Sequence, residues 1–357
     1  MEFQFVVDAQ GNNIFNEEGH ALFSSKLKRM NPKDRYTVAT WPVIHLNDSF
    51  YDVSKHTLFY IHGWTQSAND SRLDDLRDAI LTNVDVNVVL VDWGTTSNLP
   101  YVQAVSNSRI VAAQLTRLCN YLINKGSSPS QFHLIGISLG AHIAAYVAKS
   151  IPEIYRITGL DPAQPLFHGY NKEVRLHKDD AWFVEVAHTN GRPAALLGFG
   201  IYEPIGDVDF YFNGGWDQPG CINDGNYRAF AELEAGNYSL REDLHVRLFC
   251  PHVRSLLYYI EAIGNLNCLF WGVKRHSSST VINILSGGYL ARSVTYHSDC
   301  TIESCTPFGL YTVSYPARGT FDVATSYASP FCIKQPEVDA KMAEQLTNYS
   351  SKHNNEY

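Results

Sequence analysis

Several features that would place this chain in a familiar class of protein are missing from its sequence. It has no cluster of basic residues and a net charge of −8, which argues against nucleic acid as the main partner. No run of 18 apolar residues is present, so no transmembrane segment is expected. No two cysteines are separated by two residues, so their spacing does not indicate a zinc site. Charged residues make up only 18% of the 357, against 45% apolar, so a sizeable core can form and global disorder is not expected.

The cysteines that are present gather at one end of the chain. Six of the seven come after position 220: Cys221, Cys250, Cys268, Cys300, Cys305 and Cys332. This clustering resembles a disulfide framework and so predicts an oxidising compartment and a secreted protein, although it leaves the pairing open. Cys119 stands alone in a helical pattern and is expected to be a buried free thiol. The first residues do not resemble a signal peptide, so either this end is processed or truncated, or the protein is cytosolic.

Short apolar runs alternate with helical periodicity through the first half of the chain. Strands are expected at 57–61, 84–91, 132–137, 155–160 and 181–187, and helices at 71–82, 101–125 and just after 138. Strands that are apolar almost throughout predict an α/β fold with a mostly parallel sheet covered on both faces. We expect an N-terminal segment over 1–45, one α/β domain over 46–335, and a loose polar tail over 336–357.

The stretch QFHLIGISLGAHIAAYVAKS, residues 131–150, carries the strongest signal for chemistry. An apolar strand runs into Gly136-Ile137-Ser138-Leu139-Gly140 and continues as a helix, which is the context of a nucleophile elbow. The glycines allow a close strand–helix approach, and Ser138 would be exposed at the sheet edge beside the positive end of the helix. The alternative is an ordinary serine in a glycine-bracketed turn.

A serine nucleophile needs a base, an acid that orients the base, and donors for the oxyanion. Asp161 ends the strand after the elbow and is followed by a proline, so it is the candidate acid. His252 precedes a helical run over 256–263 and is the candidate base. The backbone amides of Trp64 and Leu139 are the expected oxyanion donors.

Three other histidines are assigned to structure rather than to chemistry. His142 lies one turn into the elbow helix and His188 ends a strand, so both are expected to pack or to form hydrogen bonds. His62 precedes the oxyanion candidates and is expected to shape their loop.

Several ordered motifs resemble the pancreatic lipase family, most closely its single-domain insect-type neutral lipases and the related phospholipases A1. They are HGW at 62–64, VDWG at 91–94, GISLGAH at 136–142, GLDPAQPLF at 159–167, NGG-x4-GC at 213–221, C-x-H-x-R-S at 250–255, and ARGTF and ASPF at 317–321 and 328–331. The resemblance covers about residues 55–333. It implies an α/β-hydrolase fold with Ser138, Asp161 and His252 as the catalytic triad.

The resemblance also locates further features of the family. Cys221 and Cys250, which we take as disulfide candidates, bracket the place of a lid, about 222–249, and this insert has an apolar stripe at helical spacing. A packed surface helix is the alternative. Lys172 and His177 stand where the family's calcium loop needs carboxylates, so neither a metal nor another cofactor is expected. The chain ends too early for the β-sandwich that binds colipase in vertebrate members.

Together these features predict a secreted lipase that cleaves ester bonds of neutral lipids at a lipid–water interface. A phospholipase A1 is the first alternative, because the lid insert also carries several charged residues. The insert and the loop over 188–206 are both long, which favours neutral glycerides. A lipid carrier that retains the triad with little turnover is the alternative from another class.

Overall fold

The computed structural model describes residues 51–68, 70–192, 198–221, 241–275 and 300–353, together with four short strands before them. For 241–248 and 352–353 it describes the backbone alone. The strands are β1 (Gln4–Val6), β2 (His20–Ala21), β3 (Ser24–Ser25), β4 (Ala39–Thr40), β5 (Thr57–Ile61), β6 (Asn87–Asp92), β7 (Phe132–Ile137), β8 (Arg156–Leu160), β9 (Phe183–His188), β10 (Val208–Phe212), β11 (Phe270–Lys274), β12 (Cys305–Phe308) and β13 (Gly319–Val323). The α-helices are α1 (Ser71–Asn83), α2 (Gly94–Ser97), α3 (Tyr101–Asn124), α4 (Leu139–Ser150), α6 (Arg241–Gly264) and α8 (Pro336–His353).

Within these ranges, one twisted sheet holds 11 strands in the order β1-β6-β5-β7-β8-β9-β10-β13-β11-β12, with β3 also paired to β6. Neighbouring strands run parallel through β6-β5-β7-β8-β9-β10-β13. Antiparallel strands close both edges of the sheet. Every residue of β5 to β10 is buried, as expected for parallel strands covered on both faces. The predicted α/β-hydrolase fold is confirmed.

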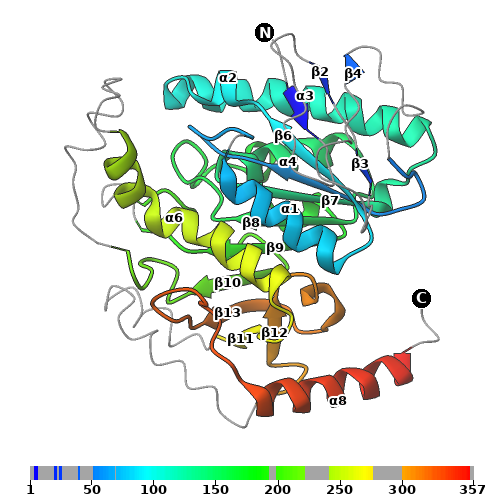
Figure 1. Ribbon diagram of the computed structural model, residues 1–357, viewed down its shortest axis with the longest axis vertical. Helices are drawn as coiled ribbons and strands as arrows, with labels where there is room; N and C mark the ends of the chain where they lie inside the picture. Colours follow the sequence, from blue (N-terminus) through cyan, green and yellow to red (C-terminus); the bar gives the residue numbers. More distant parts are fainter. Residues whose placement is uncertain are drawn as a thin grey trace.

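The helices cover opposite faces of this sheet (Figure 1). α4 packs on the face that carries Gly136, whose position leaves no room for a side chain against Gly140. α6 packs on the other face, where Tyr258 stacks on Phe212 of β10. α3 lies against α4 and α1 against α6, so each face is covered by a pair of helices.

The second half of the chain is held by disulfides. Cys221 pairs with Cys250, Cys268 with Cys332, and Cys300 with Cys305. Cys119 is free and buried in α3, as predicted, and burial raises the pKa of its thiol well above the usual value. The expected disulfide framework is therefore present in the described part of the chain.

The expected start of the helix near His252 was wrong. His252 does not precede a helix, because α6 begins at Arg241 and continues through Pro251. The buried apolar side chains after the proline, such as Leu256, stabilise the helix enough to offset the missing proline N–H. Of the predicted lid, residues 222–240 lie outside the described part of the chain, and 241–249 belong to α6.

The segment expected to be a loose polar tail is the helix α8. Val338, Met342 and Leu346 recur at a spacing of four residues and pack on a small core with Trp271 and the Cys300–Cys305 disulfide. The indole Nε1–H of Trp271 also donates a hydrogen bond to Asp339, at 2.7 Å. The apolar stripe is narrow, so the polar composition of the segment concealed an amphipathic helix.

Replacing Met342 with alanine tests whether α8 belongs to the folded unit. Met342 is fully buried, so Met342→Ala should lower the free energy of unfolding by about 2–4 kcal/mol, as for other large-to-small core changes. Urea unfolding with the disulfides intact measures this. Glu344→Ala, on the exposed side of the same helix, should stay within about 0.5 kcal/mol of wild type. Equal stability of all three proteins would mean that α8 does not contribute to the fold.

Candidate active site

Ser138 lies on the turn between β7 and α4, at the carboxyl edge of the sheet. Its backbone has φ 57° and ψ −122°, a strained conformation typical of a nucleophile elbow. A side chain at Gly140 would overlap the carbonyl oxygen of Ile61, and Gly136 contacts the backbone of Gly140. The two glycines therefore allow α4 to start directly against the sheet, which brings Ser138 to the end of the strand.

Asp161 follows β8 and is completely buried. The backbone amides of Thr189 and Asn190 donate to its Oδ1, at 2.8 and 3.0 Å. Its Oδ2 is 2.6 Å from Nδ1 of His252. Three donors thus compensate for the burial of one carboxylate, which would otherwise be costly.

His252 projects from α6 and is 5% exposed. The Asp161 carboxylate accepts a hydrogen bond from Nδ1 of His252, so Nδ1 carries the proton. The other ring nitrogen, Nε2, is then left to face the cleft as an acceptor. The rings of Phe199 and Phe249 lie 6.0 and 6.3 Å from the imidazole, measured between ring centroids. The imidazole of His252 therefore lies between a carboxylate on one side and apolar rings on the other.

The two predicted oxyanion donors lie on either side of the elbow. Leu139 is the first residue of α4, and the first amides of a helix have no acceptor within the helix. Trp64 lies in the loop after β5, and its indole N–H donates to the carbonyl of Leu99, at 2.8 Å. Gly63, the residue before Trp64, comes so close to the elbow that an added Cβ would be 2.7 Å from Cβ of Ser138. Both loops thus meet at the serine.

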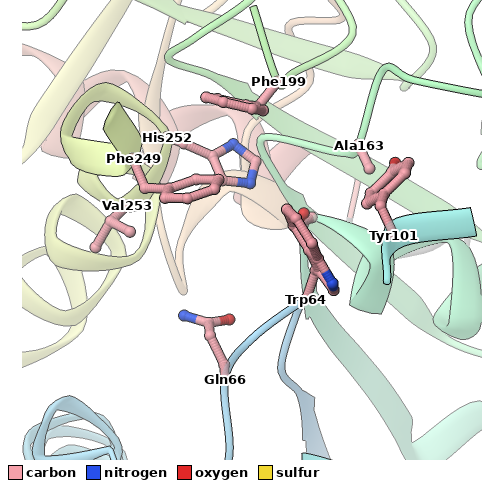
Figure 2. A pocket seen from close by; sticks show the side chains of 9 residues that line it. Trp64, Gln66, Tyr101, Ala163, Phe199, Phe249, His252 and Val253 are labelled. Atoms are coloured by element: carbon pink, nitrogen blue, oxygen red, sulfur yellow. The ribbon is translucent and has the colours of Figure 1, made fainter. Parts of the chain in front are cut away.

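A cleft of about 420 Å³, including its open mouth, contains Ser138 and His252 (Figure 2). Apart from Gln66, its other walls are apolar or aromatic. The lining residues are Trp64, Gln66, Tyr101, Ser138, Ala163, Phe199, Phe249, His252 and Val253. An apolar cleft with a few convergent polar groups is the usual form of a site for a small, largely hydrophobic ligand.

The three histidines that the sequence assigned to structure, His62, His142 and His188, have structural contacts. His62 bonds to the Asp92 carboxylate at 3.1 Å and to the Gly63 carbonyl, and so braces the loop of Trp64. Burial alone would raise the pKa of Asp92, but hydrogen bonds from His62 and a backbone amide lower it below its usual value.

His142 and His188 lie deeper in the fold. His142 bonds to the Ala163 carbonyl at 2.8 Å, and burial lowers its pKa to about 3, so it is neutral. His188 bonds to Asp209 at 2.8 Å and to the Ile201 carbonyl at 2.6 Å. It thus fixes the strand end from which the two amides reach Asp161.

Sequence reasoning missed the residues that shape the acid's surroundings. Gly200 lies so close to Asp161 that any side chain there would overlap the carboxylate. Asn190 accepts a hydrogen bond from the Phe199 amide, at 2.8 Å, and so ties this wall of the cleft to the acid loop. Both contacts join segments that are distant from Asp161 in sequence, and no local motif marks them.

The segment over 172–180, which was compared with a calcium loop, contains an ion pair and a histidine beside the same carboxylate. The Lys172 ammonium is 2.8 Å from Asp179, and His177 is 3.2 Å from the same carboxylate. Among the described residues, no group of three or more His, Cys, Asp or Glu is placed to hold a metal ion. None of the described helices has the length and apolar character needed to cross a membrane.

The fold and the elbow define an α/β-hydrolase, and comparison with known proteins identifies the family. The Lipase family model matches residues 29–316, so the chain belongs to this family. The predicted resemblance to pancreatic lipases is confirmed, although the match begins earlier than residue 55 and ends before 333.

Two curated relatives and one solved structure illustrate the similarity. Inactive pancreatic lipase-related protein 1 of Homo sapiens is 37% identical over 219 residues, which cover 61% of this chain and 46% of that protein. Pancreatic triacylglycerol lipase of Myocastor coypus is 36% identical over 235 residues, which cover 65% of this chain and 50% of that protein. The chain thus spans about half the length of these relatives. A putative α/β-superfamily hydrolase from Xanthomonas campestris pv. campestris is 12% identical with a TM-score of 0.30, covering 56% of this chain and 99% of that one, and adds no weight to the assignment.

Replacing Gly200 with alanine tests the geometry around Asp161. The new methyl group would displace the carboxylate, so Gly200→Ala should lower kcat for a short-chain p-nitrophenyl ester by about 100-fold. Gly264→Ala is the matched control, because a Cβ there would meet Ala79 at 3.4 Å, an ordinary contact. Unchanged kcat in Gly200→Ala would show that Asp161 need not occupy this position for activity.

Proposed function

We propose that the protein is a secreted lipase that hydrolyses carboxylic ester bonds of lipids through an acyl-enzyme formed on Ser138. The observation that carries this proposal is the 2.6 Å contact with Asp161 made by His252, which lines the same cleft as the elbow serine. Membership of the Lipase family supports it. The three disulfides support an extracellular location.

In the proposed mechanism His252 acts first as a base and then as an acid. Its Nε2 takes the hydroxyl proton while Ser138 Oγ attacks the ester carbonyl carbon. The tetrahedral intermediate collapses, the bond to the alcohol oxygen breaks, and His252 returns the proton to that oxygen. Water then attacks the acyl-enzyme by the same route and releases the fatty acid. Asp161 holds the imidazole in the required tautomer and stabilises its charged form.

The oxyanion would be stabilised by backbone amides alone. Leu139 N–H lies at the positive end of α4, and Trp64 N–H lies on the loop that meets the elbow. Donors held by the backbone need no reorganisation when charge develops on the carbonyl oxygen. This preorganisation is the main electrostatic contribution that we assign to the site.

The walls of the cleft support a lipid acyl group as the substrate part bound there. Trp64 packs edge-on against Tyr101, with ring centroids 5.2 Å apart, and Phe199 lies 4.6 Å from Phe249 by the same measure. Burying one methylene group in such surroundings contributes about 0.8 kcal/mol. The lengths of the lid insert and of the loop over 188–206, both read from the sequence, favour neutral glycerides over phospholipids.

The main alternative is a lipid carrier with the lipase fold and little turnover. It has a specific basis, because one relative of this chain is named as an inactive lipase-related protein. An enzyme would release a burst of p-nitrophenol from a short-chain ester and then continue to turn over, whereas a carrier would bind lipid without release. A phospholipase A1 differs only in substrate, and comparison of triolein with phosphatidylcholine separates it.

Substitutions of the proposed nucleophile and acid test the mechanism. Ser138→Ala should fold normally and lose kcat by about 10⁴- to 10⁶-fold, because no other hydroxyl replaces Oγ. Asp161→Asn should cost somewhat less, since it misorients His252 without removing it. Steady-state hydrolysis of p-nitrophenyl butyrate measures both. More than a few per cent of activity in Ser138→Ala would exclude Ser138 as the nucleophile.

Shortening the insert tests the substrate class. Replacing residues 222–240 with a short Gly/Ser linker leaves Cys221, Cys250 and α6 in place. We expect the ratio of phosphatidylcholine to triolein hydrolysis to rise, because less apolar surface would cover the acyl groove. Cleavage of p-nitrophenyl butyrate controls for an intact site. A constant ratio in an active variant would mean that the insert does not determine the substrate class.

A further inference from the structure

Gln66 carries the one side-chain amide in the described lining of the cleft, and the proposed mechanism gives it no role. It follows Trp64 by two residues and lies half-buried on the wall opposite Phe199 (Figure 2). The other uncharged polar group of the lining, the Tyr101 hydroxyl, donates to the carbonyl of Pro165, at 2.9 Å. Gln66 therefore requires an explanation of its own.

The orientation of the Gln66 amide is determined by its neighbours. The backbone N–H of Gly63 donates to Oε1 at 2.7 Å, and a backbone N–H can bond only to the oxygen of a side-chain amide. The backbone is held as well, because the Ser97 hydroxyl donates to the Gln66 carbonyl at 2.8 Å. The oxygen thus bonds to Gly63, and the Nε2 hydrogens are the donors that the amide can offer; no acceptor for them is found among the described residues.

The side-chain amide of Gln66 lies close to Ser138. The ideal Cβ position of Gly63 is 2.7 Å from Cβ of Ser138 and 3.2 Å from Oε1 of Gln66. The amide oxygen is therefore within about 6 Å of the serine Cβ. Figure 2 shows the amide oxygen of Gln66 on the side of Trp64 and the nitrogen on the opposite side. Gln66 lines the same cleft as Ser138, so its Nε2 hydrogens are accessible to a ligand bound in that cleft.

We propose that Gln66 is a substrate-binding residue whose Nε2–H donates to an oxygen in the alcohol half of the ester, and this rests on the proposed lipase function. The carbonyl oxygen of the scissile ester would be bound by the Trp64 and Leu139 amides, and the acyl chain has no further acceptor. The remaining acceptors belong to the alcohol. Gln66 would thereby favour esters of polyols, such as acylglycerols, over esters of simple alkanols.

The same amide oxygen also holds the loop of Trp64, so an experiment has to separate the two roles. Loss of loop positioning would slow every ester equally, because it acts on the common oxyanion. Loss of a hydrogen bond to the alcohol half would slow only esters that carry the second oxygen. The ratio of kcat/KM for two matched esters therefore distinguishes positioning from substrate binding.

Ethylene glycol dibutyrate and heptyl butyrate are such a pair. The alcohol halves of the two esters have the same chain length. In heptyl butyrate, methylene groups take the place of the second ester group. Both are assayed in solution, below their solubility limits, by titrating the butyric acid released. Gln66→Glu keeps an oxygen for the Gly63 amide and removes the donor, whereas Gln66→Met removes both. Gln103→Glu, at an exposed residue of α3, controls for the added charge.

We expect both Gln66 variants to lower the dibutyrate-to-heptyl ratio of kcat/KM by about 3- to 10-fold, the scale of one neutral hydrogen bond. Gln103→Glu should leave the ratio at the wild-type value. An unchanged ratio in both Gln66 variants, with heptyl butyrate still cleaved, would overturn the inference and leave the proposed function intact. Wild-type protein that cleaves neither ester would overturn the proposed function and the inference together.

Discussion

The hydrogen bond between His252 and Asp161 joins two residues that are 91 positions apart in the chain. It brings α6, on one face of the sheet, to the end of β8 in its centre. The carboxylate at this junction is fully buried, so it depends on the Thr189 and Asn190 amides as well as on the imidazole. Because these amides follow directly after β9, the geometry of the acid depends on three neighbouring elements at once.

A second buried polar network lies on the sheet face that α6 covers. Arg156 of β8 forms an ion pair with Glu185 of β9 and donates to two backbone carbonyls after β12. Thr158 donates to the same glutamate and also contacts His133, whose pKa is held well below its usual value, mainly by burial and then by Arg156. The network connects the central strands to the antiparallel edge of the sheet. Its position beneath α6 makes it part of the support for His252, although it lies outside the cleft.

Local patterns were sufficient to predict the elements that build the elbow. The strand over 132–137 is observed with the bounds that its apolar run predicted, and α4 follows it directly. The pattern works there because a buried parallel strand is apolar throughout and the glycines mark a close approach. The predicted triad rested on order along the chain and on family resemblance, and the structure adds the pairing of Asp161 with His252.

Other features could not be predicted because they depend on contacts that are distant in sequence. The helix through Pro251 is stabilised by packing on the sheet, which overrides the local tendency of proline to start a helix. The apolar stripe of α8 was visible in the sequence, but without its partner core the polar composition dominated the interpretation. Gly200 gives no local signal at all, since the carboxylate it accommodates belongs to residue 161.

In the proposed mechanism, oxyanion stabilisation and substrate contact are linked through one side chain of the loop between β5 and α1. Gln66 accepts from the amide of Gly63, and the next amide along the chain is that of Trp64. A hydrogen bond donated by Nε2 to a substrate would polarise the side-chain amide of Gln66. The bond from the Gly63 amide to Oε1 would then become stronger, because chains of hydrogen bonds reinforce one another. Binding of a polyol ester would then also hold the oxyanion loop more firmly. In such a site, selectivity for the alcohol would appear in kcat as well as in KM.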